Sequence, residues 1–498
     1  MKLFSSQQIQ EWDKYTIAHE PISSYNLMER AVQRLFEQLL AHHNVKNKTI
    51  HIFCGTGNNG GDGLALARYL KLSEANVFVI YVGDLSKATP DNYQNYTLLE
   101  TYQIPVVTFE QVDTLPNPDY IIDALLGTGL NRSVELTSLL GKAIEYINQS
   151  KAYTISIDIP SGLKGEDNRD NTGVWVKCQE VYSFQQPKIV FFLKEWAKEI
   201  ERIYVVDIGL SQEYYQKVDT NYFSLDKDTF ELHFKPRVKF SYKNSYGHAL
   251  LVGGLYDKTG AGILAAKAAY RSGCGLLTVM SNAKHQMAFN VAIPEAMFCS
   301  MQSFLEQAHK SEYLQKFNAI GIGHGLGKRP KSLKLLESIF KHYSGRCVID
   351  ADAINLLAKN PQLWEYIEGK EVVLTPHIRE AERLLQDEYP DSLSRIEACQ
   401  VLAMQKGCTI VLKDTITTLI FSDGTVYFSD NGCPGMAKGG TGDVLTGILT
   451  SLLAQPYLTK SAVIVGVYAH SIAAQKALCN YSNTALMPSD IINNLFSG

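Results

Sequence analysis

The sequence predicts an α/β protein with two domains, each built around its own mostly parallel sheet. Short apolar runs alternate with segments of helical periodicity, which is the pattern of a doubly wound sheet covered by helices on both faces. This alternation fades over residues 211–246, which are rich in Tyr, Lys, Asp and Phe, and then begins again. A chain of 498 residues is also too long for one typical core. We therefore expect domains at residues 1–222 and 223–498.

The first half alternates helices and strands in a regular order. Apolar residues at helical spacing predict two helices near the start of the chain, separated at Pro21. Apolar runs predict strands at residues 49–53, 76–82, 120–123 and 153–159. Helices are expected between them, at residues 64–72, 92–102 and 138–148. Parallel strands in this order end at one edge of a sheet, where ligands bind in such folds.

The second half repeats the pattern with a separate set of strands. Apolar runs predict strands at residues 248–253, 319–322, 347–350, 372–375 and 409–413. A long helical region follows Gly442. Residues 462–474 are apolar, but His470 interrupts them and they are shorter than the ~20 residues that span a bilayer, so we expect a buried helix.

The composition argues against several classes of protein. The net charge of -4 and the pI of about 6.3 give no basic excess for nucleic acid. The start of the chain lacks the apolar stretch of a signal peptide. Nine scattered cysteines, odd in number and without a C-x-x-C pair, indicate reduced thiols and a cytoplasmic protein rather than a disulfide framework or a zinc site.

The first predicted strand runs into a loop rich in glycine and asparagine. Residues 55–63 read Gly-Thr-Gly-Asn-Asn-Gly-Gly-Asp-Gly and contain the spacing G-x-G-x-x-G before a helix. Such a loop can bind a dinucleotide, because glycines let a phosphate approach the backbone at a helix N-terminus. The spacing alone is weakly specific, but Asn58, Asn59 and Asp62 add polar groups that a plain turn does not need. The alternative is that these residues only form the turn and cap the helix.

Two later strands of the first half end in aspartate. Asp123 is followed by Ala-Leu-Leu-Gly-Thr-Gly, and Asp158 is followed by Ile-Pro-Ser-Gly. Carboxylates at the ends of neighbouring parallel strands, next to the loop at residues 55–63, indicate a site for acid/base chemistry or for a cation. A single aspartate in such a place could equally be a turn former or a helix cap.

These motifs, together with Leu-Met-Glu-Arg-Ala at residues 27–31, resemble the NAD(P)H-hydrate epimerase family over residues 5–215. The resemblance implies a Rossmann-like three-layer domain that interconverts the R and S forms of hydrated NADH and NADPH. It implies Asp158 as the acid/base residue, and a potassium ion at Asn59, Asp123 and Ser161. The implied substrate-binding residues are Asn58, Asn59, Gly60, Gly61, Asp62, Gly127, Thr128, Gly129, Leu130, Asn131, Arg132, Ser133 and Asp158.

The most specific feature of the second half is a glycine-rich loop that ends in aspartate. Residues 431–443 read Asn-Gly-Cys-Pro-Gly-Met-Ala-Lys-Gly-Gly-Thr-Gly-Asp and open a helix of Leu, Ile and small residues. Free backbone amides and the helix dipole favour a phosphoryl group there. Asp443 can take the proton from a hydroxyl that attacks phosphorus. The loop therefore predicts phosphoryl transfer to a hydroxyl.

Other strand ends of the second half carry weaker signals. The turn at residues 321–327 is dense in glycine and can wrap a substrate or a phosphate. Residues 259–262 open a helix of small residues, for which tight packing is an equal explanation. Asp350 and Asp352 could act through bound Mg²⁺ or cap the next helix. His377 follows another strand end, where a lone histidine is as often structural as functional.

Together these motifs resemble the ribokinase-like superfamily and, within it, the nucleotide-dependent NAD(P)H-hydrate dehydratase family, over residues 225–495. The resemblance implies a three-layer α/β/α domain with Asp443 as its catalytic residue. The implied contacts to the hydrated cofactor are Ala261, Gly325, His377 and Asp443. The implied contacts to the adenine nucleotide are Lys413, Asp414, Thr415, Ile416, Thr417 and Gly442. Two residues depart from the family pattern, His324 in place of proline and Asp414 in place of glycine.

The two resemblances together imply a bifunctional enzyme of cofactor repair. The first domain would interconvert the epimers, and the second would use ADP or ATP with Mg²⁺ to phosphorylate and then dehydrate the S form, so that ADP gives AMP and phosphate. The partners are then hydrated NADH or NADPH and an adenine nucleotide, without nucleic acid or membrane, in a homo-oligomer such as a tetramer. A small-molecule kinase with an N-terminal sensor domain, or a non-catalytic nucleotide-binding module in the first half, would explain parts of the same pattern.

Overall fold

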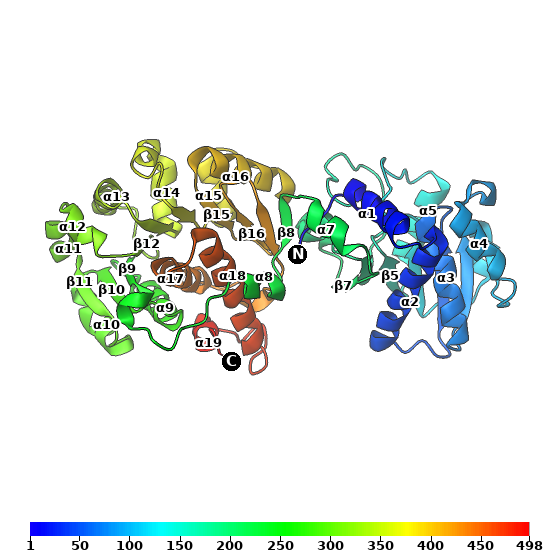
Figure 1. Cartoon of the computed structure of the whole chain (residues 1–498), viewed down its shortest axis with the longest axis horizontal. Helices are drawn as coiled ribbons and strands as arrows, with labels where there is room; N and C mark the ends of the chain where they lie inside the picture. Colours follow the sequence, from blue (N-terminus) through cyan, green and yellow to red (C-terminus); the bar gives the residue numbers. More distant parts are fainter. Residues whose placement is uncertain (498) are drawn as a thin grey trace. The chain divides into compact units, whose positions relative to one another are not determined.

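The computed structural model describes residues 1–497, which form two compact units. The first unit is Lys2–Thr220, and the second contains Met1 and the chain from Asn221 onward. Each unit has its own sheet, and helices connect most of its strands (Figure 1). The predicted α/β class is confirmed in both units.

The sheet of the first unit is parallel throughout the described residues and has the strand order β3-β2-β1-β4-β5-β6-β7. Its strands are β1 (Thr49–Cys54), β2 (Asn76–Tyr81), β3 (Val106–Thr108), β4 (Tyr120–Ala124), β5 (Tyr153–Ile157), β6 (Glu180–Phe184) and β7 (Arg202–Val206). The direction of winding reverses between β1 and β4, which is the point where ligands bind in doubly wound sheets.

Helices cover both faces of this sheet, which makes the first unit three-layered. They are α1 (Ser6–His19), α2 (Ser24–His42), α3 (Asn58–Leu72), α4 (Pro90–Leu98), α5 (Leu139–Gln149), α6 (Lys194–Ala197) and α7 (Gln212–Lys217). Alternate residues of β1 enter different cores, as the pleat of a strand requires. Ile50 and Ile52 pack with apolar residues of α2 and α3, whereas Phe53 packs with those of α5.

The second unit has a larger, mixed sheet with the strand order β11-β10-β9-β12-β13-β14-β15-β16-β17-β8. Its strands are β8 (Tyr222–Ser224), β9 (His248–Val252), β10 (Leu276–Ser281), β11 (Met297–Ser300), β12 (Ala319–Ile322), β13 (Arg346–Ile349), β14 (Val372–Leu374), β15 (Thr409–Leu412), β16 (Thr417–Ile420) and β17 (Val426–Ser429). The pairs β15–β16 and β16–β17 are antiparallel, and the other pairs are parallel.

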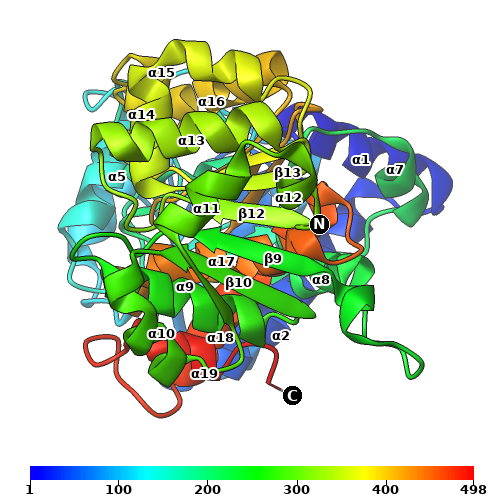
Figure 2. The same cartoon turned by 90° about the vertical axis from the view of Figure 1, so that its left-hand side faces the viewer.

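Helices again lie on both faces, so the expected α/β/α layers are confirmed. Figure 2 shows α13 (Pro330–His342), α14 (Ala351–Lys359), α15 (Ile378–Leu385) and α16 (Ser392–Lys406) on one side of β9 and β12. On the other side lie α9 (Thr259–Arg271), α17 (Thr441–Ala454), α18 (Thr459–Ala477) and α19 (Pro488–Asn493). The shorter helices are α8 (Lys227–His233), α10 (Gln286–Ala292), α11 (Met301–Ala308) and α12 (Ser311–Gln315).

The central helices of the second unit are almost entirely buried. The helix expected at residues 462–474 is part of α18, most of whose residues are buried, as predicted. Its inward-facing residues pack with those of α9 and α17 in one apolar core. Along residues 1–497, no helix combines the length and apolarity that a membrane crossing requires.

The structure differs from the sequence prediction at two kinds of place. Helix α3 begins at Asn58 rather than at residue 64, so that residues 58–63 of the glycine-rich loop are helical. The unpredicted strands are β3, β6, β7, β8, β10, β11, β16 and β17. Most of these are only three to five residues long, which is too short for periodicity to separate them from other apolar runs.

Candidate active sites

The glycines after β1 allow α3 to lie directly against the ends of two strands. Gly57 is the N-cap of α3, and no side chain caps its first amides. A Cβ atom on Gly60 would lie 1.9 Å from the Gly55 carbonyl oxygen, and one on Gly63 would lie 2.5 Å from the Cβ of Ala124. This close packing brings the uncapped first turn of α3 to the carboxyl edge of the sheet, where a phosphate or another anion is favoured.

A cavity of about 800 Å³ opens at this edge of the first unit. That volume lies within the range of small-molecule sites, ~300–1,000 Å³. Most residues predicted to bind the substrate line it: Asn58, Asn59, Asp62, Gly127, Thr128, Gly129, Leu130, Asn131, Arg132, Ser133 and Asp158. Gly60 and Gly61 are not among the lining residues, because they pack closely against Gly55 and the Met28 side chain. Gln10, Asp13, Thr89 and Phe184 also line the cavity and were not predicted.

Asp123 ties two loops together beneath the cavity. Its buried carboxylate accepts hydrogen bonds from the Ser156 hydroxyl at 2.9 Å, from the Ser161 amide at 2.8 Å and from the Ser161 hydroxyl at 2.5 Å. Burial raises the pKa of Asp123, although these hydrogen bonds partly offset the rise. The carboxylate therefore orders the loops that follow β4 and β5.

Asn59 supplies a buried oxygen next to these loops. Its amide nitrogen donates to the Leu126 carbonyl at 2.9 Å, and the Ser161 hydroxyl lies 3.2 Å from the same carbonyl oxygen. The Asn59 Oδ1 atom is buried and has no hydrogen-bond partner among the described residues. The predicted trio of Asn59, Asp123 and Ser161 is thus linked through one loop, and its oxygen atoms are of the kind that hard cations prefer.

Asp158 has an unusual backbone conformation and pairs with a buried lysine. Its φ of 65° lies in the left-handed region, which a residue other than glycine adopts at a cost. Its carboxylate accepts from the Phe184 amide at 3.1 Å and forms an ion pair with the Lys188 ammonium at 2.8 Å. Lys188 is 1% exposed and also donates to the Ser183 hydroxyl at 3.1 Å. Lys188 was not predicted, because it lies beyond the last strand recognised in this half.

The cavity also contains carboxyl groups that do not ionise readily. Asp62 is completely buried, which raises its pKa well above the ordinary value, and the negative charges of Asp158 and Asp13 raise it further. A carboxyl group whose pKa is raised therefore shares the cavity with the Asp158–Lys188 ion pair. Carboxyl groups with shifted pKa values are common in sites that catalyse proton transfer.

In the second unit, Asp443 stands in the first turn of α17. The helix begins after Gly440, whose φ of 99° requires glycine, and no side chain caps it. Burial, and the neighbouring charge of Asp350, raise the pKa of Asp443 to about 6, although Lys413 and Lys258 lower it in part. A carboxylate with this pKa can accept a proton near neutral pH.

Asp350 organises the groups around Asp443. Its carboxylate is 2.8 Å from the Lys413 ammonium and accepts from the hydroxyls of Thr375 at 2.7 Å and Thr446 at 2.8 Å. Burial alone would raise the pKa of Asp350, but Lys413 and these hydrogen bonds bring it below its ordinary value. Its oxygens are therefore engaged by donors, and its side chain does not cap α14.

The other predicted residues of this unit fall into three groups. A Cβ atom on Gly325 would lie 3.4 Å from the Cβ of Ala261, so these two residues are neighbours. A Cβ atom on Gly442 would lie 3.3 Å from the Lys413 ammonium, and Lys413 pairs with His377 across a parallel β-bridge. The third group lies in and directly after the turn between β15 and β16 that follows Lys413: Asp414, Thr415, Ile416 and Thr417.

His324 changes the packing of the glycine-rich turn rather than its charge. Its ring is completely buried, and both ring nitrogens lack hydrogen-bond partners among the described residues. Burial lowers the pKa of His324 to about 4, so the ring is neutral at physiological pH. A Cβ atom on Gly253 would lie 2.6 Å from its Nε2 atom. The histidine therefore fills the space between two glycine-containing strand ends.

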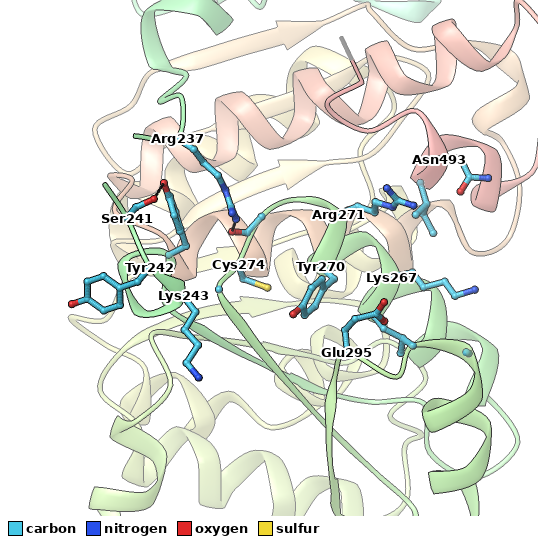
Figure 3. Close-up of a pocket in the computed structure, with 16 residues that line it drawn as sticks. Arg237, Ser241, Tyr242, Lys243, Lys267, Tyr270, Arg271, Cys274, Glu295 and Asn493 are labelled. Atoms are coloured by element: carbon cyan, nitrogen blue, oxygen red, sulfur yellow. Dashed lines mark hydrogen bonds between the residues drawn. The ribbon is translucent and has the colours of Figure 1, made fainter. Parts of the chain in front are cut away.

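A second hollow in this unit is separate from the predicted residues. Figure 3 shows this cavity of about 950 Å³, which lies where β9 and β10 begin, at the opposite edge of the sheet from Asp350. Basic and aromatic residues line it, among them Arg237, Lys243, Lys267, Arg271 and Tyr270. No predicted site residue is part of it.

Comparison with known families assigns the two halves of the chain. Residues 249–496 match the family described as NAD(P)H-hydrate dehydratase, and residues 24–190 match the family described as YjeF-related protein N-terminus. The bifunctional NAD(P)H-hydrate repair enzyme of Coxiella burnetii is 33% identical over 495 residues, covering 99% of this chain and 98% of the relative. The enzyme of the same description from Moorella thermoacetica is 30% identical over 519 residues, covering 99% and 96%.

Among solved structures, an ADP/ATP-dependent NAD(P)H-hydrate dehydratase from Bacillus subtilis, co-crystallised with ATP and Mg²⁺, has a TM-score of 0.49 and 26% identity. The match spans 56% of this chain and 97% of the Bacillus subtilis protein.

Proposed function

Because the chain belongs to the family of bifunctional NAD(P)H-hydrate repair enzymes, we propose that its first unit interconverts the epimers of hydrated NADH and NADPH, and that its second unit dehydrates the S form at the expense of ADP or ATP. The observation that carries the second assignment is the position of Asp443 at the uncapped start of α17, beside Lys413 and Asp350. The first assignment is supported by the carboxyl-lined cavity around Asp158.

Dehydration by the second unit needs a better leaving group than hydroxide. Asp443 takes the proton from the substrate hydroxyl, whose oxygen then attacks the terminal phosphorus of the nucleotide. The free amides at the start of α17 stabilise the transferring phosphoryl group. The bond between that phosphorus and its bridging oxygen breaks, which releases AMP, or ADP when ATP is used. Phosphate then leaves C6 with the bonding pair while C5 gives its proton to solvent, so that the double bond of the ring is restored and the other products are NAD(P)H and phosphate.

We assign the remaining predicted residues of the second unit to binding. Ala261, Gly325 and His377 would hold the hydrated cofactor. Gly442 lies next to the Lys413 ammonium, so the two together suit a nucleotide phosphate. The segment that follows would hold the rest of the adenine nucleotide: Asp414, Thr415, Ile416 and Thr417.

Magnesium would arrive with the nucleotide rather than on carboxylates of this chain. Asp350 is engaged by Lys413 and two hydroxyls, and Asp352 pairs with the Lys258 ammonium at 2.9 Å. Residues 1–497 contain no group of three His, Cys, Asp or Glu side chains placed to hold a metal ion. The phosphates are then the principal ligands that remain for Mg²⁺.

Potassium fits the first unit better. Oxygen ligands for a cation are available from the Asn59 Oδ1 atom, which has no partner among the described residues, and from the Leu126 carbonyl. The hydrogen bonds between Asp123 and Ser161 hold the surrounding loop in place. A bound cation would order the loop at residues 127–133 against α3. Replacing K⁺ by Li⁺ should therefore lower the unfolding temperature of the wild-type first unit, and should have no such effect on an Asn59→Ala variant.

One experiment with two variants tests both activities. Protein is mixed with hydrated NADH, ADP and Mg²⁺, and recovery of the reduced nicotinamide is followed by its absorbance. Asp443→Ala should abolish recovery and keep epimer exchange, whereas Asp158→Asn should keep dehydration of the S form and leave exchange at its uncatalysed rate. A phosphorylated product without recovered NADH would instead identify a kinase. Loss of both activities in either variant would contradict the division between the units.

We further propose that the protein is cytoplasmic and homo-oligomeric. Its nine cysteines are all free, which supports a reducing compartment. Light scattering of the purified protein measures its oligomeric state directly.

A further inference from the structure

Asp13 is a carboxyl group that the mechanism above does not use. It lies on α1 and lines the same cavity as Asp158 and Asp62. Its neighbours Trp12 and Thr16 are buried in the core, so the helix is fixed in place. Within residues 1–497 its side chain has neither a hydrogen bond nor an ion pair, although it is only partly exposed. A carboxyl group that is partly removed from water without a partner ionises less readily, and such groups are common at functional sites.

The charges around Asp13 come from three other segments of the first unit. Asp158 follows β5, Lys188 precedes the short helix after β6, and Asp62 lies in α3. Burial and the negative charge of Asp158 raise the pKa of Asp13 to about 7, while Lys188 opposes the rise. Asp158 itself is paired with the Lys188 ammonium. Near neutral pH the cavity therefore holds a carboxyl group that can give a proton, Asp13, together with Asp158, which is paired with an ammonium.

Inversion at the hydrated ring requires both of these functions. The hydroxyl is on C6, which is bonded to the ring nitrogen N1. When an acid protonates the hydroxyl, the C6–O bond breaks, water leaves with the bonding pair, and the lone pair of N1 forms a C6=N1 double bond with a positive charge. Water then adds to the other face of C6 with its own electron pair and gives its extra proton to a base. No oxidant or other reactant is needed, and the atoms balance.

We propose that Asp13 is a further catalytic residue of this cavity, and that it works with Asp158 to carry the proton to and from the C6 hydroxyl. In one direction Asp13 is the acid and Asp158 the base, and in the other direction their roles exchange. The inference rests on the proposed epimerase function of the first unit. Asp62 is a weaker candidate for the exchange of roles, because burial and the charges of Asp158 and Asp13 raise its pKa and so disfavour the ionised form that a base needs.

The first test compares two neutral substitutions on one helix. Asp13→Asn keeps the shape of the side chain but has no proton to transfer, so the catalysed rate of epimer exchange should fall by about 10²-fold or more. Glu11→Gln removes a carboxylate from an exposed position on α1, where the side chain accepts hydrogen bonds from Gln7 and from the Tyr214 hydroxyl, and the rate should stay within about twofold. Exchange is measured by chromatography without nucleotide, and the thermal unfolding of each variant, compared with that of the wild type, serves as the check on folding of the first unit.

A pH profile separates proton transfer from a merely structural role. In the wild-type protein the exchange rate should fall as the pH rises through about 7, because Asp13 then loses its proton. This fall in rate with rising pH should be absent from Asp13→Asn. Asp13→Glu should restore part of the rate and the same dependence on pH. An Asp13→Asn protein with the wild-type rate, or with the wild-type dependence on pH, overturns the proposal.

Labelled water tests the broken bond without any substitution. If C6–O cleavage is the route, wild-type protein in H₂¹⁸O should introduce ¹⁸O into the hydroxyl as fast as it interconverts the epimers, and faster than an enzyme-free blank does. Catalysed interconversion without label overturns the proposal while the epimerase function stands. A wild-type protein that does not accelerate interconversion at all removes the epimerase function itself, so the two failures are distinguishable.

Discussion

Asp158 in the first unit and Asp443 in the second are both placed at the carboxyl edge of their sheets, but their charges are managed differently. Asp158 touches a buried ammonium, that of Lys188, at 2.8 Å. Among the described residues no cation forms an ion pair with Asp443, because the nearby Lys413 is bound to Asp350 and Lys258 to Asp352. The first arrangement gives a carboxylate a direct ion pair, and the second leaves one whose pKa is raised to about 6. The same fold class thus supplies a carboxylate with or without a cation of its own, depending on which carboxylate the lysine contacts.

Replacing Lys188 should have the largest effect on stability and activity, because it removes the ammonium that distinguishes the surroundings of Asp158 from those of Asp443. Lys188→Met leaves Asp158 buried without its partner, which should destabilise the first unit by about 3 kcal/mol and lower the rate of epimer exchange by about 10²-fold. Thermal unfolding and exchange measurements check the two effects. Lys48→Met removes the half-exposed pair with Asp119 and should cost less than about 1 kcal/mol. Equal costs for the two variants would contradict a special role for burial at Asp158.

Removing Lys413 should have the next largest effect, on the other unit. Lys413→Met takes away the cation that lowers the pKa of both Asp350 and Asp443, so both carboxyl groups should titrate at higher pH. The rate of dehydration should fall by about 10²-fold at neutral pH. The pH below which this rate declines should be higher than in the wild type. Lys406→Met, at an exposed position of α16, is the control. An unchanged dependence on pH in Lys413→Met would show that Asp443 does not respond to this lysine.

The two activities of the wild-type protein should respond to pH in opposite directions. Asp443 must be ionised to accept a proton, so kcat/KM for dehydration should fall as the pH is lowered through about 6. Asp13 must be protonated to give one, so kcat/KM for epimer exchange should fall as the pH is raised through about 7. Each limb is expected to approach tenfold per pH unit. Parallel profiles for the two activities would contradict the assignment of these carboxyl groups.

The smallest effect concerns stability. The pKa of Asp13 is raised from 3.8 to about 7 in the folded protein, so the folded state binds this proton more tightly than the unfolded chain does. Stability therefore falls as the pH rises through this window, and Asp13→Asn should be more stable than the wild type above it. We expect a gain of about 1 kcal/mol, or ~2–4 °C in Tm, because water in the cavity screens part of the charge. Calorimetry at pH 8 measures it, with Glu11→Gln as the variant that should not gain.

The fold and the positions of the main carboxylates could be predicted from the sequence because they depend on local patterns. Apolar runs mark the strands, and an aspartate at the end of a parallel strand is placed at the ligand edge whatever its neighbours are. Asp123 and Asp158 were found in this way. Asp443 was found through its glycine-rich loop, and the structure places it beside Asp350 and Lys413.

Residues that reach a site from another segment could not be predicted in this way. Asp13 stands on a helix whose sequence looks like that of any amphipathic helix, and only the packing of α1 brings it to the cavity. Lys188 follows a strand that was not recognised. The helical start of α3 was also missed, because glycine disfavours helices in general, whereas here close contact with β1 and β4 outweighs that preference.

The backbone at Asp158 limits which residues can stand there. Its φ of 65° is tolerated by glycine, asparagine and aspartate far better than by branched or bulky side chains. Glycine would fit the turn but lacks a carboxyl group. Glutamate can adopt this conformation, as Glu74 does with a φ of 62°, but its side chain is one carbon longer, so its carboxyl group would not keep the contacts that Asp158 makes with Lys188 and the Phe184 amide. The turn and these contacts together therefore favour a short carboxylate side chain at this position.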